Sequence, residues 1–301
     1  MSGPLFISSG DLIADRRYDF ARAYAADGDL AAAADLYAQA VELVPGFASA
    51  WFALGEAREA LGDREGARAA FARALEADRD DRHGAALHLA RLGGADPAAA
   101  ALQTYVRTLF DQYAPRFDRA LEDLSYSAPA TLREAVMKHG TRFGSMLDLG
   151  CGTGLAGAAF RPHVDWLAGV DLSPKMVEQA QAKGLYDRLA VADIGSYLAA
   201  QREAVFHLVI AADVFAYVAD IADVCAAVKR VLSTGGLFAF TVETHDGDGA
   251  IVGTKMRYAH GETFVRDAIR DAGLTLVELT RASSRTENRI PVPGLLAVAG
   301  R

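Results

Sequence analysis

Three glycines alternate with other residues in the segment Asp148-Leu149-Gly150-Cys151-Gly152-Thr153-Gly154. The segment follows an apolar run that is typical of a buried strand, and it precedes a stretch with helical periodicity. A glycine-rich turn between a strand and a helix lets the backbone approach a bound ligand more closely than side chains would permit. The spacing therefore predicts a ligand site at the carboxyl end of a strand.

Acidic residues end the next two apolar runs. Asp171 comes seventeen residues after Gly154, and a carboxylate there can accept hydrogen bonds from both hydroxyls of a ribose. Asp193 follows the third run. Asp171 can alternatively cap the helix expected from Ser173 and Pro174, but its place beside the glycine loop favours a ligand that contains ribose and adenine.

Two cofactors of that kind compete for the site. A nicotinamide dinucleotide requires a small residue at position 155, so that its pyrophosphate can lie on the helix N-terminus, and this chain has Leu155. Asp148 precedes the first glycine and instead suits a cationic ligand without phosphate, in direct contact or through a water. The pattern favours S-adenosylmethionine, whose amino and sulfonium groups are cationic.

Polar side chains around this edge are the candidates for chemistry on a methyl acceptor. The candidate catalytic residues are Tyr113, Tyr217 and His245, and the candidate substrate-binding residues are Glu243, Arg257 and His260. Methyl transfer requires an acceptor atom about 3–3.5 Å from the methyl carbon, and a base only where a proton must leave. Either histidine can act as that base, and Arg257 can bind a substrate carboxylate. The alternative is a solvated polar loop in which His260 caps the helix that starts at Gly261.

Short apolar runs alternate with helical stretches from residue 146 onward, which is typical of a parallel sheet with helices on both faces. The expected strands are 146–149, 166–170, 189–192, 206–211 and 237–242, and the expected helices lie near 155–160, 174–183, 195–202, 220–232 and 261–272. Two further runs, 275–279 and 295–299, are expected to close the sheet as a hairpin. The charged cluster of Arg281, Arg285, Glu287 and Arg289 is then expected in the loop between them, in contact with substrate or only with water.

The first ninety residues repeat with a period of 34, which superposes Gly28 on Gly62 and Tyr37 on Phe71. Residues 15–82 resemble tetratricopeptide repeats, and the residues that carry the resemblance are Trp51, Leu54, Gly55, Ala67, Phe71 and Ala74. Because such arrays usually need about three repeats, residues 83–92 are expected to cap the end of the array. The repeats can form a groove for a protein partner, or they can serve for packing or dimerisation.

Composition narrows the function classes. The chain has 301 residues, of which 31 are basic and 39 acidic, so its formal charge of −8 argues against nucleic acid and anionic membranes as partners. Two cysteines, Cys151 and Cys225, are too few for a disulfide framework or a zinc cluster. The first residues do not read as a signal peptide, and no apolar run approaches about 18 residues. We therefore expect a cytoplasmic protein without a bound metal.

From about residue 105 to 301 the chain resembles class I S-adenosylmethionine-dependent methyltransferases. The matching segments are MLDLGCGTG at 146–154, GVDLSPKM at 169–176, VADI at 191–194, HLVIAADVFAYV at 207–218 and LSTGGLFAFTVE at 232–243. With the repeats in front, the whole chain resembles bacterial methyltransferases that carry tetratricopeptide repeats. The resemblance implies a Rossmann-like α/β fold with a seven-stranded sheet whose last strand is antiparallel.

The resemblance also implies roles for individual residues. Gly150 and Gly152 would line the methionine part of the cofactor, and Asp171 would bind the ribose. Leu172, Met176, Asp193 and Ile194 would contact the adenine. The remaining implied cofactor-binding residues are Asp148, Cys151 and Ala211, and no nucleophilic role is assigned to Cys151. The segment 104–118 resembles the helical lid that small-molecule methyltransferases place over the cofactor.

The sequence thus predicts a repeat domain over 1–94, a helical lid or linker over 95–140 and an S-adenosylmethionine-binding domain over 141–301. The predicted function is methyl transfer to a small organic acceptor, with the repeats used for protein interaction or packing. The alternative is an interaction scaffold whose cofactor-binding domain is not catalytic.

Overall fold

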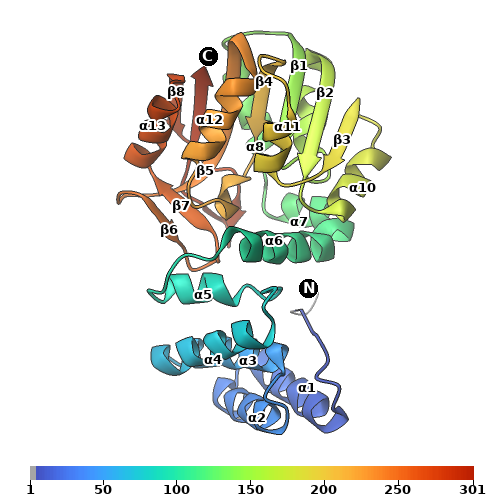
Figure 1. Cartoon of the computed structure of the whole chain (residues 1–301), viewed down its shortest axis with the longest axis vertical. Coiled ribbons are helices and arrows are strands. Elements are labelled where there is room, and N and C mark those ends of the chain that lie inside the picture. The colour runs from blue at the N-terminus through green and yellow to red at the C-terminus, as the bar shows by residue number, and fades with distance from the viewer. Residues whose placement is uncertain (1–4) are drawn as a thin grey trace. The chain divides into compact units, whose positions relative to one another are not determined.

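The computed structural model describes residues 5–301 (Figure 1). The chain forms two compact units, which divide between Thr108 and Leu109. Helix α6 (Ala99–Tyr113) crosses this division. The lid or linker expected over residues 95–140 therefore has residues in both units. The division into three parts expected from the sequence stays a prediction. Within residues 5–301, no helix is long and apolar enough to cross a membrane.

The first unit contains two helical hairpins of nearly equal length. Their helices are α1 (Leu12–Ala26), α2 (Leu30–Leu43), α3 (Ala48–Ala60) and α4 (Arg64–Ala77). Aspartates at equivalent positions begin the second helix of each hairpin: Asp29 accepts a hydrogen bond from the Ala32 backbone N–H at 3.0 Å, and Asp63 accepts one from Gly66 at 2.9 Å. The period of the sequence is therefore also a structural repeat.

Close packing holds the second hairpin together. Phe71 of α4 is fully buried, and its ring lies where a Cβ on Gly55 of α3 would be 2.6 Å away. The short helix α5 (Ala85–Arg91) follows, with Leu87 buried in it and Leu92 buried just after it. Because Leu92 shares an apolar cluster with Phe71, the predicted cap over residues 83–92 is confirmed.

The second unit is a mostly parallel sheet with helices on both faces (Figure 1). Seven strands form its main path: β1 (Phe143–Leu149), β2 (Val164–Asp171), β3 (Arg188–Val191), β4 (Phe206–Ala211), β5 (Leu232–His245), β8 (Thr275–Arg281) and β11 (Gly294–Gly300). Their order is β3-β2-β1-β4-β5-β11-β8, and β11 is antiparallel to both neighbours. The predicted Rossmann-like sheet with an antiparallel last strand is confirmed.

Two apolar cores lie on opposite faces of this sheet. The first involves α11 (Ile194–Ala200), α12 (Ala222–Val231) and α13 (Glu262–Asp271), and the second involves α8 (Ala128–Met137) and α9 (Leu155–Phe160). Leu147 of β1 belongs to the first core and Met146 to the second, because successive side chains of a strand alternate between faces. This double covering explains the nearly continuous apolar runs in the sequence.

The structure differs from expectation beyond β5. A solvated polar loop is the alternative considered for residues 257–260, but β7 (Tyr258–Gly261) pairs in parallel with the end of β5 and antiparallel with β6 (Ala250–Val252). His260 is fully buried, and the helix that follows, α13, has no side-chain cap. The solvated loop and the capping role of His260 are therefore wrong, because the end of β5 provides a backbone ladder for this polar segment.

The packing of α3 on α4 can be tested at Gly55. Gly55→Ala should lower the free energy of unfolding by about 1–3 kcal/mol, because the added methyl group overlaps the Phe71 ring. Gly46→Ala is the matched control, since a Cβ there meets nothing within 4 Å. Urea unfolding of the full chain, followed by circular dichroism, measures the difference. Equal stability of the two variants would contradict this close packing.

Candidate functional site

The loop between β1 and α9 has a backbone conformation that glycine adopts readily and other residues do not. Gly150, Gly152 and Gly154 have φ angles of +62°, +53° and +91°, in the left-handed region that strains residues with a Cβ. At Gly150 a Cβ would also lie 2.6 Å from Cγ2 of Val214. Conformation and space both require glycine here, and the loop therefore presents backbone atoms rather than side chains.

Asp171 connects the end of β2 to this loop. Its Oδ2 accepts a hydrogen bond from the Gly152 backbone N–H at 2.9 Å, and its Oδ1 accepts one from Ser173 N–H at 2.8 Å. Burial raises the pKa of Asp171, while these backbone donors oppose the rise. The capping residue of α10 (Pro174–Ala182) is Ser173, whose Oγ accepts from Met176 N–H, so Asp171 is not the cap considered as its alternative role.

Asp148 is buried near the end of β1, with 1% of its surface exposed. Its Oδ2 accepts a hydrogen bond from the Tyr186 hydroxyl at 2.6 Å, whereas Oδ1 is buried and has no hydrogen-bond partner among residues 5–301. Burial raises the pKa of Asp148 to about 7, and the hydrogen bond from Tyr186 opposes this rise. Asp148 is thus a buried carboxylate with one oxygen left to accept a donor.

Tyr186 is a part of the site that the sequence analysis does not identify. Its ring fills a slot between three glycines, and an added Cβ would lie 3.0 Å from the ring at Gly154, 2.7 Å from it at Gly169 and 2.3 Å from its hydroxyl oxygen at Gly157. The glycines are visible in the sequence. Their common partner is not, because Tyr186 reaches them from the connection between α10 and β3.

The helical segment before the sheet is fastened to the loops around the glycine turn. Asp111 of α6 accepts a hydrogen bond from the Ser173 hydroxyl at 2.5 Å. Asp118 of α7 (Phe117–Asp123) accepts one from the Thr153 hydroxyl and pairs with the Lys183 ammonium group at 2.7 Å. The segment that resembles a lid therefore contacts the loops after β1 and β2 through two carboxylates.

The aromatic side chains of this segment differ in their surroundings: Phe110 packs against other rings, whereas Tyr113 is exposed. Phe110 makes edge-to-face contact with Tyr217, with ring centroids 5.4 Å apart, and also contacts Phe117. Tyr113 is 39% exposed, and the Arg116 guanidinium lies 4.7 Å from its ring centroid. Tyr217 is therefore in contact with the lid-like segment, whereas Tyr113 faces solvent on one side. Their catalytic roles remain predictions.

The other predicted cofactor residues occupy the same edge of the sheet. Asp193 caps α11 by accepting from Ser196 N–H at 2.9 Å, and its pKa is lowered by bonds from Ser196 although burial opposes this. Met176 and Ala211 are buried, and Leu172 and Ile194 are half-buried. Burial raises the pKa of the Cys151 thiol well above its usual value, so this thiol is protonated at neutral pH.

Arg285 is the centre of a buried ionic cluster. Only 5% of its side chain is exposed, and its guanidinium contacts Asp213 at 2.9 Å, Glu287 at 3.4 Å and Glu243. Arg257 reaches Glu287 at 2.9 Å and Glu243 at 3.5 Å. We call these five residues the arginine network. Arg285 and Glu287 lie between β8 and β11, as expected from the sequence, but their charges pair with other side chains rather than only with water.

Asp213 of the arginine network has a strained backbone, and two tyrosines lie within electrostatic reach of the network. Asp213 has a φ of +58°, and its backbone N–H and Oδ1 both bond to the Thr241 hydroxyl, at 2.9 and 3.0 Å. Tyr217 lies within electrostatic reach of Arg257. Burial, together with Asp213 and Asp148, raises the pKa of Tyr126 far above its usual value, so Tyr126 is a neutral hydroxyl within electrostatic reach of both acids. Tyr126 carries no signal in the sequence that marks it as part of a site.

Both candidate histidines are bonded to the backbone. His245 accepts from Gly247 N–H at Nδ1, 3.1 Å away, and its Nε2 lies 3.2 Å from the Gly249 carbonyl oxygen. His260 Nε2 lies 2.9 Å from the Val218 carbonyl oxygen, and its buried Nδ1 has no partner among residues 5–301. Burial lowers the pKa of His260, which favours a neutral ring. Their roles as a base and as a substrate-binding residue remain predictions.

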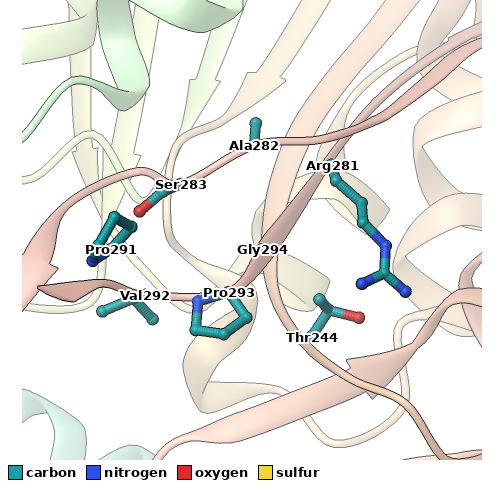
Figure 2. A pocket seen from close by; sticks show the side chains of 8 residues that line it. All are labelled: Thr244, Arg281, Ala282, Ser283, Pro291, Val292, Pro293 and Gly294. Atoms are coloured by element: carbon teal, nitrogen blue, oxygen red, sulfur yellow. The ribbon is translucent and has the colours of Figure 1, made fainter.

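A cavity of about 300 Å³ lies beside β5 and the connection from β8 to β11 (Figure 2). Its lining residues are Thr244, Arg281, Ala282, Ser283, Pro291, Val292, Pro293 and Gly294. Thr244 follows Glu243 directly, so the two side chains point to opposite faces of β5. None of the residues that line the cavity belongs to the arginine network.

Comparison with known proteins agrees with this geometry. Residues 147–240 match the family described as Methyltransferase domain, and residues 24–92 match the family described as Tetratricopeptide repeat. Human Methyltransferase-like protein 27 is 30% identical over 171 residues, which cover 55% of this chain and 66% of that protein. The chain thus spans slightly less than two thirds of the length of this relative.

Two solved structures share the fold. The 1,6-didemethyltoxoflavin-N1-methyltransferase of Burkholderia thailandensis, solved with S-adenosylhomocysteine, is 22% identical with a TM-score of 0.54 and covers 69% of this chain and 92% of its own. The cyclase SpnF is 16% identical with a TM-score of 0.55 and covers 66% of this chain and 96% of its own. At such identities the likeness shows the fold alone.

Residues 147–240 of the second unit therefore match a methyltransferase domain, and this unit shares its fold with a methyltransferase solved with S-adenosylhomocysteine. Residues 24–92, in front of this domain, match a tetratricopeptide repeat, as the motifs indicate.

The contact between Tyr186 and Asp148 predicts a pH-dependent stability. The folded-state pKa of Asp148, about 7, exceeds its unfolded value, so the folded protein binds more protons between about pH 4 and 7 and this group makes the protein less stable as the pH rises through that window. Tyr186→Phe removes a donor to the carboxylate and should cost about 1–3 kcal/mol at pH 8 but less at pH 5. Urea unfolding at both pH values measures this. A loss independent of pH, or one larger at pH 5, would contradict the assignment, and Asp148→Asn should abolish the difference.

Proposed function

We propose that this chain transfers a methyl group from S-adenosylmethionine to a small organic acceptor at the carboxyl edge of its sheet. The observation that carries the proposal is the hydrogen bond between Asp171 and the Gly152 N–H. This bond places a carboxylate suited to a ribose beside a loop of backbone atoms, at the edge where ligands of open α/β sheets bind.

The residues at this edge fit the cofactor. Asp171 would hold the ribose hydroxyls, and Gly150, Cys151 and Gly152 would hold the methionine part through the loop backbone. The unpartnered Oδ1 of Asp148 would attract its cationic end. The proposed contacts of the adenine and its surroundings are Leu172, Met176, Asp193, Ile194 and Ala211. When bound, S-adenosylmethionine supplies an electrophilic methyl group.

The chain's own residues exclude water from this edge and orient the acceptor. Asp111 and Asp118 hold the segment 109–123 against the loops after β1 and β2, which shields the site from solvent. Tyr126 stays neutral, so it can donate a hydrogen bond but does not act as a base. Tyr113, Tyr217 and His245 remain the proposed catalytic side chains, and Glu243, Arg257 and His260 the proposed substrate-binding ones.

The relatives support a small acceptor. The Burkholderia enzyme acts on 1,6-didemethyltoxoflavin, as its name states, and this chain has the same fold. We propose the repeat region as a surface for protein interaction or for packing. An interaction scaffold with a non-catalytic cofactor-binding domain is the alternative.

Cofactor binding is tested by removing the charge of Asp171. Asp171→Asn should weaken S-adenosylhomocysteine binding by about tenfold or more, because a charge-assisted hydrogen bond contributes about 1.5–3 kcal/mol. Asp165→Asn is the matched control, since Asp165 forms an exposed pair with Arg142. Isothermal titration calorimetry on the full chain measures both. Equal affinity of the two variants would show that Asp171 does not bind the cofactor.

Catalysis is tested by S-adenosylhomocysteine release in a broad panel of small metabolites. Release that requires an acceptor and stops in Asp171→Asn supports methyl transfer. A protein that binds the cofactor and releases nothing with any acceptor, yet retains a protein partner through its repeats, would favour the scaffold instead.

A further inference from the structure

The arginine network leaves no cation of its own to bind an acidic substrate. It contains two guanidinium groups, Arg257 and Arg285, and three carboxylates, Asp213, Glu243 and Glu287. Its formal charge is therefore −1. Arg285 is 5% exposed and Arg257 is 27% exposed, so both are matched inside the protein rather than held in solvent.

Each of the two glutamates contacts the arginines through only one of its carboxylate oxygens. Glu243 contacts both arginines through Oε1, and Glu287 also contacts both through Oε1. Among residues 5–301, the arginines make no contact with Oε2 of either side chain. A carboxylate oxygen only accepts hydrogen bonds, so a group that binds there must donate.

The network lies at the edge where the proposed transfer takes place. Glu243 is near the end of β5, and Asp213 follows β4, next to β1 in the sheet. Tyr126 lies within electrostatic reach of Asp148, Asp213 and Arg285, so the network and the cofactor-side carboxylate Asp148 share one neighbour. Tyr217 joins the network to Phe110 of the lid-like segment.

We infer that the acceptor presents a hydrogen-bond donor, an amine or a hydroxyl, to Glu243 and Glu287, and that the site rejects carboxylate acceptors. This inference rests on the proposed function, because it concerns the same site. An anion would meet the free oxygens of two glutamates with no unmatched cation in the network, whereas a neutral or cationic amine would find hydrogen-bond acceptors. Under this inference Glu243 keeps its proposed substrate-binding role, whereas the role of Arg257 changes from binding substrate to positioning Glu243 and Glu287.

The first experiment compares benzylamine and benzoate as probes on the full chain saturated with S-adenosylhomocysteine. The inference predicts that the unmodified protein does not bind benzoate saturably. In Glu243→Gln/Glu287→Gln the arginines lose two of their three carboxylates, so benzoate affinity should rise at least tenfold. Glu262→Gln is the matched control, because Glu262 forms an exposed pair with Arg266.

Three outcomes decide the matter. Benzoate binding by the unmodified protein as tight as that of benzylamine overturns the inference, and so does a folded double variant that gains no benzoate affinity. If the double variant does not fold, Glu287→Gln alone replaces it with the same expected direction. Failure of the unmodified protein to bind S-adenosylhomocysteine would instead overturn the proposed function.

The metabolite panel gives a second readout. Grouped into amines, alcohols and carboxylates, it should show S-adenosylhomocysteine release with amines or alcohols and none with carboxylates. Release with carboxylates alone, or equally in all three groups, overturns the inference while leaving methyl transfer in place.

Discussion

The site depends on one short-range constraint, the hydrogen bond from the Gly152 backbone N–H to the Asp171 carboxylate. It forms only because the loop after β1 turns through left-handed conformations at its glycines. The bond fixes the ends of β1 and β2 relative to each other, and the same two loops then receive the carboxylates of Asp111 and Asp118. The glycine loop, the Asp171 carboxylate and the covering segment are therefore parts of one hydrogen-bonded unit.

The features that the sequence predicts well are local. Apolar runs predict the strands because both faces of the sheet are covered, so nearly every residue of a central strand is buried. The place of Asp171 follows from its distance to the glycine loop along the chain. The repeat is visible because small and aromatic residues recur with a period of 34, as Gly28 and Gly62 or Tyr37 and Phe71 do, in a pattern that close helix packing requires.

The features that the sequence does not predict depend on contacts between distant segments. Tyr186 is an ordinary tyrosine in a connection until the fold places it against three glycines. Arg285 and Glu243 are 42 positions apart, and polarity alone suggests that each is solvated. His260 looks like a loop residue because the pairing of β7 with β5 cannot be read from either segment alone. Charge pairs and strand pairs between segments this far apart in the sequence can be identified only from the folded structure.

The slot around Tyr186 restricts how this protein can diverge. Gly154, Gly157 and Gly169 each leave room for the same ring, so a side chain at any one of them collides with it. A smaller residue at position 186 would have to appear first, and it would leave Asp148 without its donor. Positions 154, 157, 169 and 186 should therefore change together or not at all over evolutionary time. A protein changed at only one of these positions would fold poorly or bind its ligand poorly.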